Sequence, residues 1–321
     1  MNRHDGRGAG DLAWLHEPVD DYAGTPSDAD YKPAGKDVTI DNLSIENALE
    51  QLRNFSAEAV DQVATTFEGA ISISGTLTPG TMWLLNHVYG SPPSQSGSGP
   101  YTYEWAPDTQ RAQSARFYTG LDYLSGYAER ALKGVVFPQF EITNQIGETS
   151  TFSATAFYAD EEFASSATPG SEPTVGDPFV FHGGNFSYGG SSLVKMQEAT
   201  LSIETNARPQ RGWERKPVDA VLGGINYTLS PSKIVTTTDL LTDAYGNSSA
   251  PATSPNALSS TTATLDLSND SDDLALDCAG VKTESYDWES IGNPDEDKTE
   301  APELSPTEVR PAFTTDLAEA R

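Results

Sequence analysis

The chain has 321 residues, which is long enough for two ordinary domains, and it carries 47 acidic residues against 19 basic ones. The resulting formal net charge of −28 excludes tight nucleic-acid binding through a broad basic face, because like charge repels phosphate. A disordered acidic chain is also disfavoured, since 5 Trp, 13 Tyr and 12 Phe are too many for a chain without a core. The charge is spread along the sequence. It favours a host that lives at high salt, or else a channel through which nucleic acid passes without adhering.

The single cysteine, Cys278, excludes an intramolecular disulfide and a thiolate zinc site. It lies in the alternating run 274–278, and we expect it to be a small buried apolar side chain. The first residues lack the basic and apolar regions of a signal peptide, and no stretch reaches the roughly 18 apolar residues of a membrane helix. We therefore expect no membrane span, and assembly inside the cell that makes the protein.

The N-terminal part of the chain predicts an arm followed by strands. Residues 1–36 are rich in Gly, Asp and Pro, which is typical of an extended arm. Residues 67–77 alternate between apolar and polar side chains, and this pattern indicates a strand with one dry face and one wet face. The wet face carries Glu68, Ser72, Ser74 and Thr76.

A short helix is predicted next, because Thr78-Pro79-Gly80 is a helix start and Gly90 is a stop. Short strands then recur as far as Tyr158, separated by Gly, Asn and Asp. Such frequent punctuation favours a sandwich or barrel over a parallel α/β sheet. The predicted fold class is therefore mainly β.

The same motif occurs twice, because Leu43-Ser44-Ile45-Glu46 recurs 158 residues later as Leu201-Ser202-Ile203-Glu204. Eight of the 21 ungapped positions from 43 to 63 are identical to their counterparts. A second helix is predicted to end at Tyr245-Gly246, as the first ends at Tyr89-Gly90. We interpret the repeat as two tandem β-sandwich or barrel modules, each with a short helix and a long hairpin loop. Coincidence between Ser/Thr-rich β segments is the alternative.

These patterns divide the chain into five segments. They are an N-terminal arm (1–36), a first β module (37–165), a linker and entry strand (166–189), a second β module (190–292) and an acidic C-terminal tail (293–321).

No motif for catalysis or metal binding is present. The four histidines lie far apart, and carboxylate pairs are too numerous for any one of them to stand out. We predict no catalytic residue, no cofactor and no metal. A two-carboxylate glycoside hydrolase on a β-sandwich is the enzyme that this composition would allow.

The most unusual local feature is a basic loop at 208–217, centred on Trp213. Its counterpart in the first module carries Arg53 and Phe55. Trp and Arg are typical anchors of contacts between subunits, and we predict that both loops bind a neighbouring copy. A solvated loop is the alternative. The basic residues of the second loop are Arg208, Arg211, Arg215 and Lys216.

The order of these elements resembles the major tail tube proteins of tailed viruses. The matching segments are two strands over 43–77 around the loop with Arg53, the helix at 78–90, and a closing hairpin formed by 134–142 and 149–158. The resemblance implies two tail-tube-type modules in a virion structural protein. It also implies rings that stack into a tail tube, a conduit for DNA ejection into the host.

The resemblance also implies the partners. The chain would bind itself in homotrimeric rings with pseudo-six-fold symmetry, or alternatively in homohexameric rings, and it would bind other tail proteins. DNA would pass without specific binding along a bore lined by the wet face, and the acidic composition would suit a virus of a halophilic archaeon. A baseplate or tail-completion protein of the same fold, or a cell-surface β-sandwich adhesion protein, are the alternatives.

Overall fold

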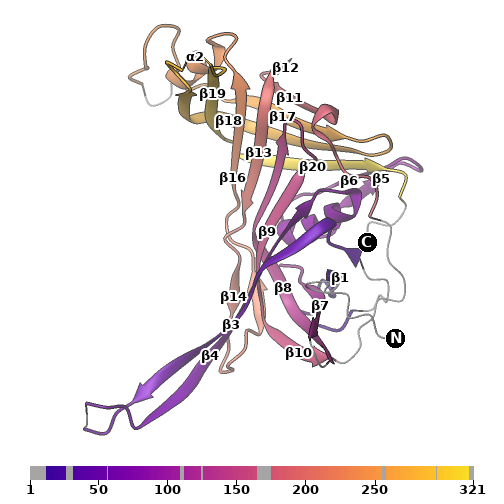
Figure 1. Cartoon of the computed structure of the whole chain (residues 1–321), viewed down its shortest axis with the longest axis vertical. Coiled ribbons are helices and arrows are strands. Elements are labelled where there is room, and N and C mark those ends of the chain that lie inside the picture. The colour runs from indigo at the N-terminus through magenta and orange to yellow at the C-terminus, as the bar shows by residue number, and fades with distance from the viewer. Residues whose placement is uncertain are drawn as a thin grey trace.

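The computed structural model describes residues 12–26, 32–55, 57–108, 112–123, 126–164, 175–254, 258–293 and 295–317. Within this part the chain is mainly β, as predicted, and Figure 1 shows long strands with a few short helices. Three parts of the predicted segments lie outside the described residues: 1–11 and 27–31 of the N-terminal arm, 166–174 of the linker, and the last four residues.

Eight antiparallel strands form one continuous sheet, which we call the long sheet. In spatial order these are β3 (Lys36–Leu52), β4 (Asp61–Thr76), β9 (Thr151–Tyr158), β8 (Gly126–Gln145), β13 (Met196–Glu204), β16 (Asn226–Ile234), β19 (Thr299–Ser305) and β18 (Asp273–Glu289). Its two end strands are therefore β3 and β18. Two strands of this sheet, β8 and β18, take part only with their C-terminal halves.

The N-terminal halves of β8 and β18 leave the long sheet and each joins a smaller one. The sheet around β8 contains β1 (Leu12–His16), β2 (Lys32–Pro33), β7 (Ala115–Tyr123) and β10 (Asp160–Ala164). The sheet around β18 contains β5 (Ser94–Ser96), β6 (Tyr101–Glu104), β11 (Gly184–Tyr188), β12 (Ser191–Ser192), β17 (Thr261–Ser268) and β20 (Glu308–Thr315). A separate small hairpin joins β14 (Arg208–Gln210) to β15 (Asp219–Val221).

A glycine with a left-handed backbone stands at each of the two bends. Gly134 in β8 has φ 69° and Gly280 in β18 has φ 62°, a conformation that L side chains rarely adopt. A Cβ on Gly280 would also lie 2.1 Å from Oγ1 of Thr307. These two glycines allow one strand to serve two sheets, so that the smaller sheets fold over the dry face of the long one.

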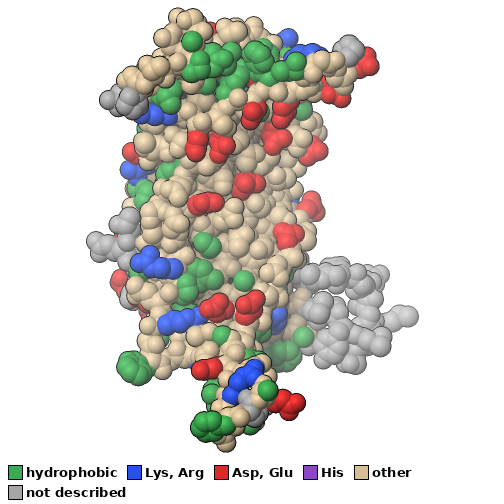
Figure 2. All heavy atoms as spheres, turned by 90° about the vertical axis from the view of Figure 1, so that its left-hand side faces the viewer, with side chains coloured by type: hydrophobic (Ala, Val, Ile, Leu, Met, Phe, Trp, Pro, Cys, Tyr) green, Lys and Arg blue, Asp and Glu red, His purple; other side chains and the backbone are tan. Residues whose placement is uncertain are grey.

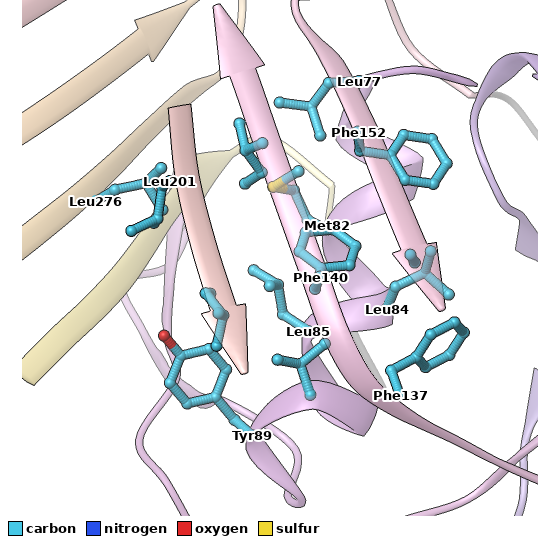
Figure 3. Packing of buried hydrophobic residues seen from close by; sticks show 14 of the residues in the cluster. Leu77, Met82, Leu84, Leu85, Tyr89, Phe137, Phe140, Phe152, Leu201 and Leu276 are labelled. Carbon is cyan, nitrogen blue, oxygen red and sulfur yellow. The ribbon is translucent and has the colours of Figure 1, made fainter. Parts of the chain in front are cut away.

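The core lies between the long sheet and the two smaller ones, and a helical segment fills it. This segment consists of η1 (Pro79–Leu84) and α1 (Leu85–Tyr89), whose residues are all buried. Figure 3 shows Leu85 of α1 beside Phe140 of the long sheet, and Leu201 of the same sheet beside Leu276. The main apolar cluster extends from Trp14 to Phe313, so the two predicted modules share one core. Cys278 is buried in it, as predicted.

The prediction of an acidic tail over 293–321 was wrong for most of that segment. It contains β19 and β20, in which alternate residues are buried, and Phe313 is fully inside the core. The described part of the predicted N-terminal arm is also structured, because β1 pairs with β7 and Trp14 is fully buried. Gly, Asp and Pro residues obscured the strand pattern in the arm, and acidic residues and Pro obscured it in the tail.

The strands of the two halves pair in the same order. The first half has the pairs β3–β4, β4–β9, β9–β8 and β8–β7, and the second has β13–β16, β16–β19, β19–β18 and β18–β17. Leu43 faces Ile71, and 158 positions later Leu201 faces Leu229. Ala115 faces Val135, and 146 positions later Thr261 faces Val281. Further pairs that match are Gln139–Thr155 with Ser285–Glu303, and Val136–Phe157 with Lys282–Ser305.

Each half also has a short helix after its first hairpin. The second helix, α2 (Asp239–Tyr245), ends at Gly246 in the left-handed conformation, as α1 ends at Gly90. A left-handed glycine closes a helix without steric cost, so the sequence sets both ends. The order of elements and the strand registers are thus alike in the two halves.

A buried ion pair joins β16 to β19. Lys233 Nζ lies 2.6 Å from Glu300 Oε1, and the two side chains are only 3% and 1% exposed. The hydroxyl of Tyr286 donates to Glu300 Oε2 at 2.5 Å, and Trp288 Nε1 donates to the Tyr286 hydroxyl at 2.7 Å. The ion pair therefore also fixes two aromatic side chains on the end strand β18.

We predict that breaking this pair is costly and that replacing it whole is not. Lys233→Met or Glu300→Leu alone leaves an uncompensated buried charge and should lower the free energy of unfolding by about 3–5 kcal/mol. The double variant should stay within about 1 kcal/mol of the original or exceed it, because apolar packing can replace a buried pair. Urea unfolding measures both, and a double variant as unstable as the single ones would contradict the prediction.

Candidate assembly interface

The outward face of the long sheet is polar and acidic. On its five central strands, β4, β9, β8, β13 and β16, the residues that point away from the core include no Lys or Arg. Figure 2, which views the molecule from this side, shows acidic side chains over its middle. The acidic residues at these positions are Glu68, Glu141, Glu198 and Glu204.

The predicted lumen-facing residues all lie on β4, on this outward face. Ser72 and Ser74 alternate with Ile71 and Ile73, which are buried in the core. Ser72 Oγ also lies 3.5 Å from Oγ1 of Thr155 on the neighbouring strand β9. Glu68 and Thr76 follow the same alternation toward the two ends of the strand.

Both ends of the long sheet are open. Among the described residues, β3 pairs only with β4, and residues 282–289 of β18 pair only with β19. Each end strand therefore has one side of backbone N–H and C=O groups without a strand partner, which is a template for pairing with another chain. The end strands of the two smaller sheets, β2, β10, β5 and β12, have at most five residues, whereas β3 has 17. The long sheet thus offers the two extended pairing edges.

A groove lies beside the open edge of β18, between this strand and α2. Trp288 in its wall is 50% exposed, and Ile291 beside it is exposed as well. Exposed apolar surface of this kind marks a contact with a partner. The apolar side chains that line the groove are Leu241, Ala244, Tyr245, Tyr286, Trp288 and Ile291.

The β3–β4 hairpin projects from the body as an arm (Figure 1). Phe55 lies at its tip and is fully exposed, and four further apolar side chains on the arm are exposed. Arg53 stays within the tip, where its guanidinium donates to Gln51 Oε1 at 3.1 Å and to the carbonyl of Ala57. The four further apolar residues are Leu49, Leu52, Val60 and Val63.

The basic loop at 208–217 packs against the base of this arm. Arg211 Nη2 donates to the carbonyl of Phe67 at 2.8 Å, and Arg215 donates to the side chain of Asn47. Trp213 is fully exposed. Lys216 Nζ pairs with Asp160 Oδ1 at 2.5 Å, and Arg208 lies exposed on β14. Four of the basic residues predicted to bind a neighbour, Arg53 among them, are therefore already bonded within the chain, and Phe55 and Trp213 remain as exposed apolar side chains.

Sequence reasoning missed the groove and the open edges. The groove joins α2 to a strand more than 30 positions further along, and no local pattern predicts such a contact. The signal available was Tyr286-Asp287-Trp288, two aromatic residues in a stretch that is otherwise polar.

Residues 19–306 match the family model described as phage tail tube protein. The chain belongs to the phage tail tube protein family. No curated protein sequence matches it.

Family membership makes this tail tube protein a structural component of the virion, which assembles with itself and with other tail proteins. In the described part of the chain, no helix is long and apolar enough to cross a membrane. The same residues hold no group of three or more His, Cys, Asp or Glu side chains placed to bind a metal ion. The surfaces of this site are the outward face, the two open edges, the groove and the arm.

Proposed function

We propose that this tail tube protein forms rings that stack into a tube, and that the tube conducts DNA from the virion into the host without catalysis. One observation carries the proposal: the long sheet combines an outward face free of basic residues on its central strands with two open ends. An open sheet that meets another copy end to end makes a longer sheet, and a closed circle of copies leaves no edge.

The matching order and registers of the two halves support a chain built from two tandem tube modules. Doubling of one ancestral module would explain the 158-residue repeat in the sequence. Each chain would then fill two positions of a ring with pseudo-six-fold symmetry. A homotrimer completes such a ring, and a homohexamer of whole chains is the alternative.

The width of the bore favours three copies over two. Each chain supplies eight strands to the long sheet, so three chains would bring 24. At about 4.8 Å per strand, 24 strands span a circumference of about 115 Å, or a diameter of about 37 Å between backbones. Two chains would give about 24 Å between backbones before side chains are added, which is too narrow for a DNA duplex. Tilting the strands widens either ring further.

The surface chemistry is consistent with passage of DNA. A polar wall whose central strands carry acidic side chains and no Lys or Arg offers phosphates no cationic partner there, so DNA would slide without adhering. The exposed Phe55 and Trp213 would anchor neighbouring copies, as predicted from the sequence. The net charge of −28 further supports a host that lives at high salt, such as a halophilic archaeon.

The assembly itself can be tested by negative-stain electron microscopy of the purified protein. We expect rings or tubes with a central hole in molar salt, because salt screens the repulsion between chains that each carry a charge of −28. Lowering the salt should dissociate them. Unassembled particles without a central hole at every salt concentration would contradict the proposal.

The lining of the bore can be tested by adding positive charge to it. Virions in which the tail tube protein carries Ser72→Arg and Ser74→Arg should release DNA at least several-fold more slowly, because arginine binds phosphate. Ser94→Arg with Ser96→Arg is the matched control, since these exposed serines lie on β5, outside the long sheet. Release rates equal to those of the control would show that Ser72 and Ser74 do not face the passing DNA.

A further inference from the structure

The long sheet contains, in its interior, a complete strand pairing of the kind that its two open edges lack. Where the two halves of the long sheet meet, β8 pairs with β13, so that Phe140 faces Ile203 and Ile142 faces Leu201. All four side chains are fully buried. We call this contact the internal junction. In the spatial order of the long sheet, it joins β8, the last strand of the first half, to β13, the first strand of the second half.

The corresponding strands at the outer ends of the chain are β18 and β3. The registers place Tyr286 and Trp288 146 positions after Phe140 and Ile142. They place Leu43 and Ile45 158 positions before Leu201 and Ile203. The outer residues are apolar like those of the internal junction, but Trp288 is 50% exposed and Ile45 is 43% exposed. Each end of the chain thus shows one half of an uncovered junction.

The two helices show the same contrast. Leu85, Val88 and Tyr89 of α1 are completely buried, and α1 lies over the internal junction (Figure 3). Their sequence counterparts Leu241, Ala244 and Tyr245 of α2 line the open groove beside β18. The groove is therefore the place where α2 would cover a strand, and no strand of the described residues lies there.

We propose that β3 of a second copy occupies this place. It adds to the open edge of β18 in antiparallel orientation, and its Leu43 and Ile45 side chains enter the groove below α2. The register of the internal junction fixes the pairs. They are Asn42–Glu289, Leu43–Trp288, Ser44–Asp287, Ile45–Tyr286 and Glu46–Ser285. This seam between copies rests on the proposed ring, and it specifies the residues that close it.

The positions of the acidic side chains are consistent with this register. The three acidic side chains of the seam, Glu46, Asp287 and Glu289, each face a neutral residue, as Glu141 faces Ser202 in the internal junction. A slip of one residue would turn the apolar side chains of β3 out of the groove. A slip of two residues in one direction would place Asp287 opposite Glu46, and like charges directly opposite are destabilising.

Engineered disulfides test the register residue by residue. In a Cys278→Ala background, Ser44→Cys with Asp287→Cys should form cross-links between copies under mild oxidation, because directly opposite residues on paired strands bring their Cβ atoms within about 5.5 Å. Asn42→Cys with Glu289→Cys is a second matched pair on the same face. Ser44→Cys with Ser285→Cys is the control for a slip of two residues, and should cross-link at least tenfold less.

The ladder of cross-linked species on a denaturing gel is the readout, with rings followed by electron microscopy in the same samples. Cross-links at both matched pairs, with a ladder that ends at a closed ring, support the seam. Rings in which the control pair links as well as the matched pairs would overturn the register and leave the proposed tube standing. Rings without cross-links at any pair would overturn the β3–β18 contact. Absence of rings from the unmodified chain would remove the proposed function, and the seam with it.

Discussion

The structure depends on the need to pair backbone hydrogen-bonding groups along the two ends of one long sheet. A strand of 17 residues with one open side is a strong template for another strand, and β3 is such a strand. Inside the chain, the same need is met where β8 meets β13, and apolar side chains and α1 cover that contact completely. The long sheet thus ends at two edges that complement each other in the proposed seam.

The bends at Gly134 and Gly280 make this arrangement possible. Each lets one strand leave the long sheet halfway and join a smaller sheet that closes the core over the dry face. Among the described residues, no further sheet covers the outward face, although the basic loop packs on it near Glu68. The two end strands stay accessible to a neighbour. The same backbone feature, a left-handed glycine within a strand, thus occurs at both bends. It separates the core, which lies on the dry side of the long sheet, from the surfaces that are available for assembly.

The negative charge of the chain opposes its assembly and also sets the surface chemistry of the proposed tube. With a formal charge of −28 per chain, copies repel each other at low salt, so the seam must rely on burial of apolar side chains and on backbone hydrogen bonds. The buried pair of Lys233 and Glu300 contributes by holding Tyr286 and Trp288 at the edge where a neighbour would bind. In the proposed tube, the same acidity leaves the central strands of the wall without Lys or Arg side chains to bind phosphate.

Sequence patterns predicted the regular parts of this fold and missed those formed by distant contacts. The alternation at 67–77 identified β4 and its wet face, and the repeat at Leu43 and Leu201 identified two strands whose pairing the structure shows to be alike. The strands β19 and β20 were not predicted because Pro302 and Pro311 lie within them, and proline is rare in paired strands. The groove was not predicted because α2 and the end of β18 come together only in the folded chain.

The most direct test is a cryo-electron microscopy reconstruction of the assembled particle. The account predicts three chains per ring and one continuous sheet around the bore, with β3 of each chain beside β18 of the next and Ser72 and Ser74 facing the hole. Six chains per ring, or a bore lined by the sheet that contains β5 and β20, would contradict it.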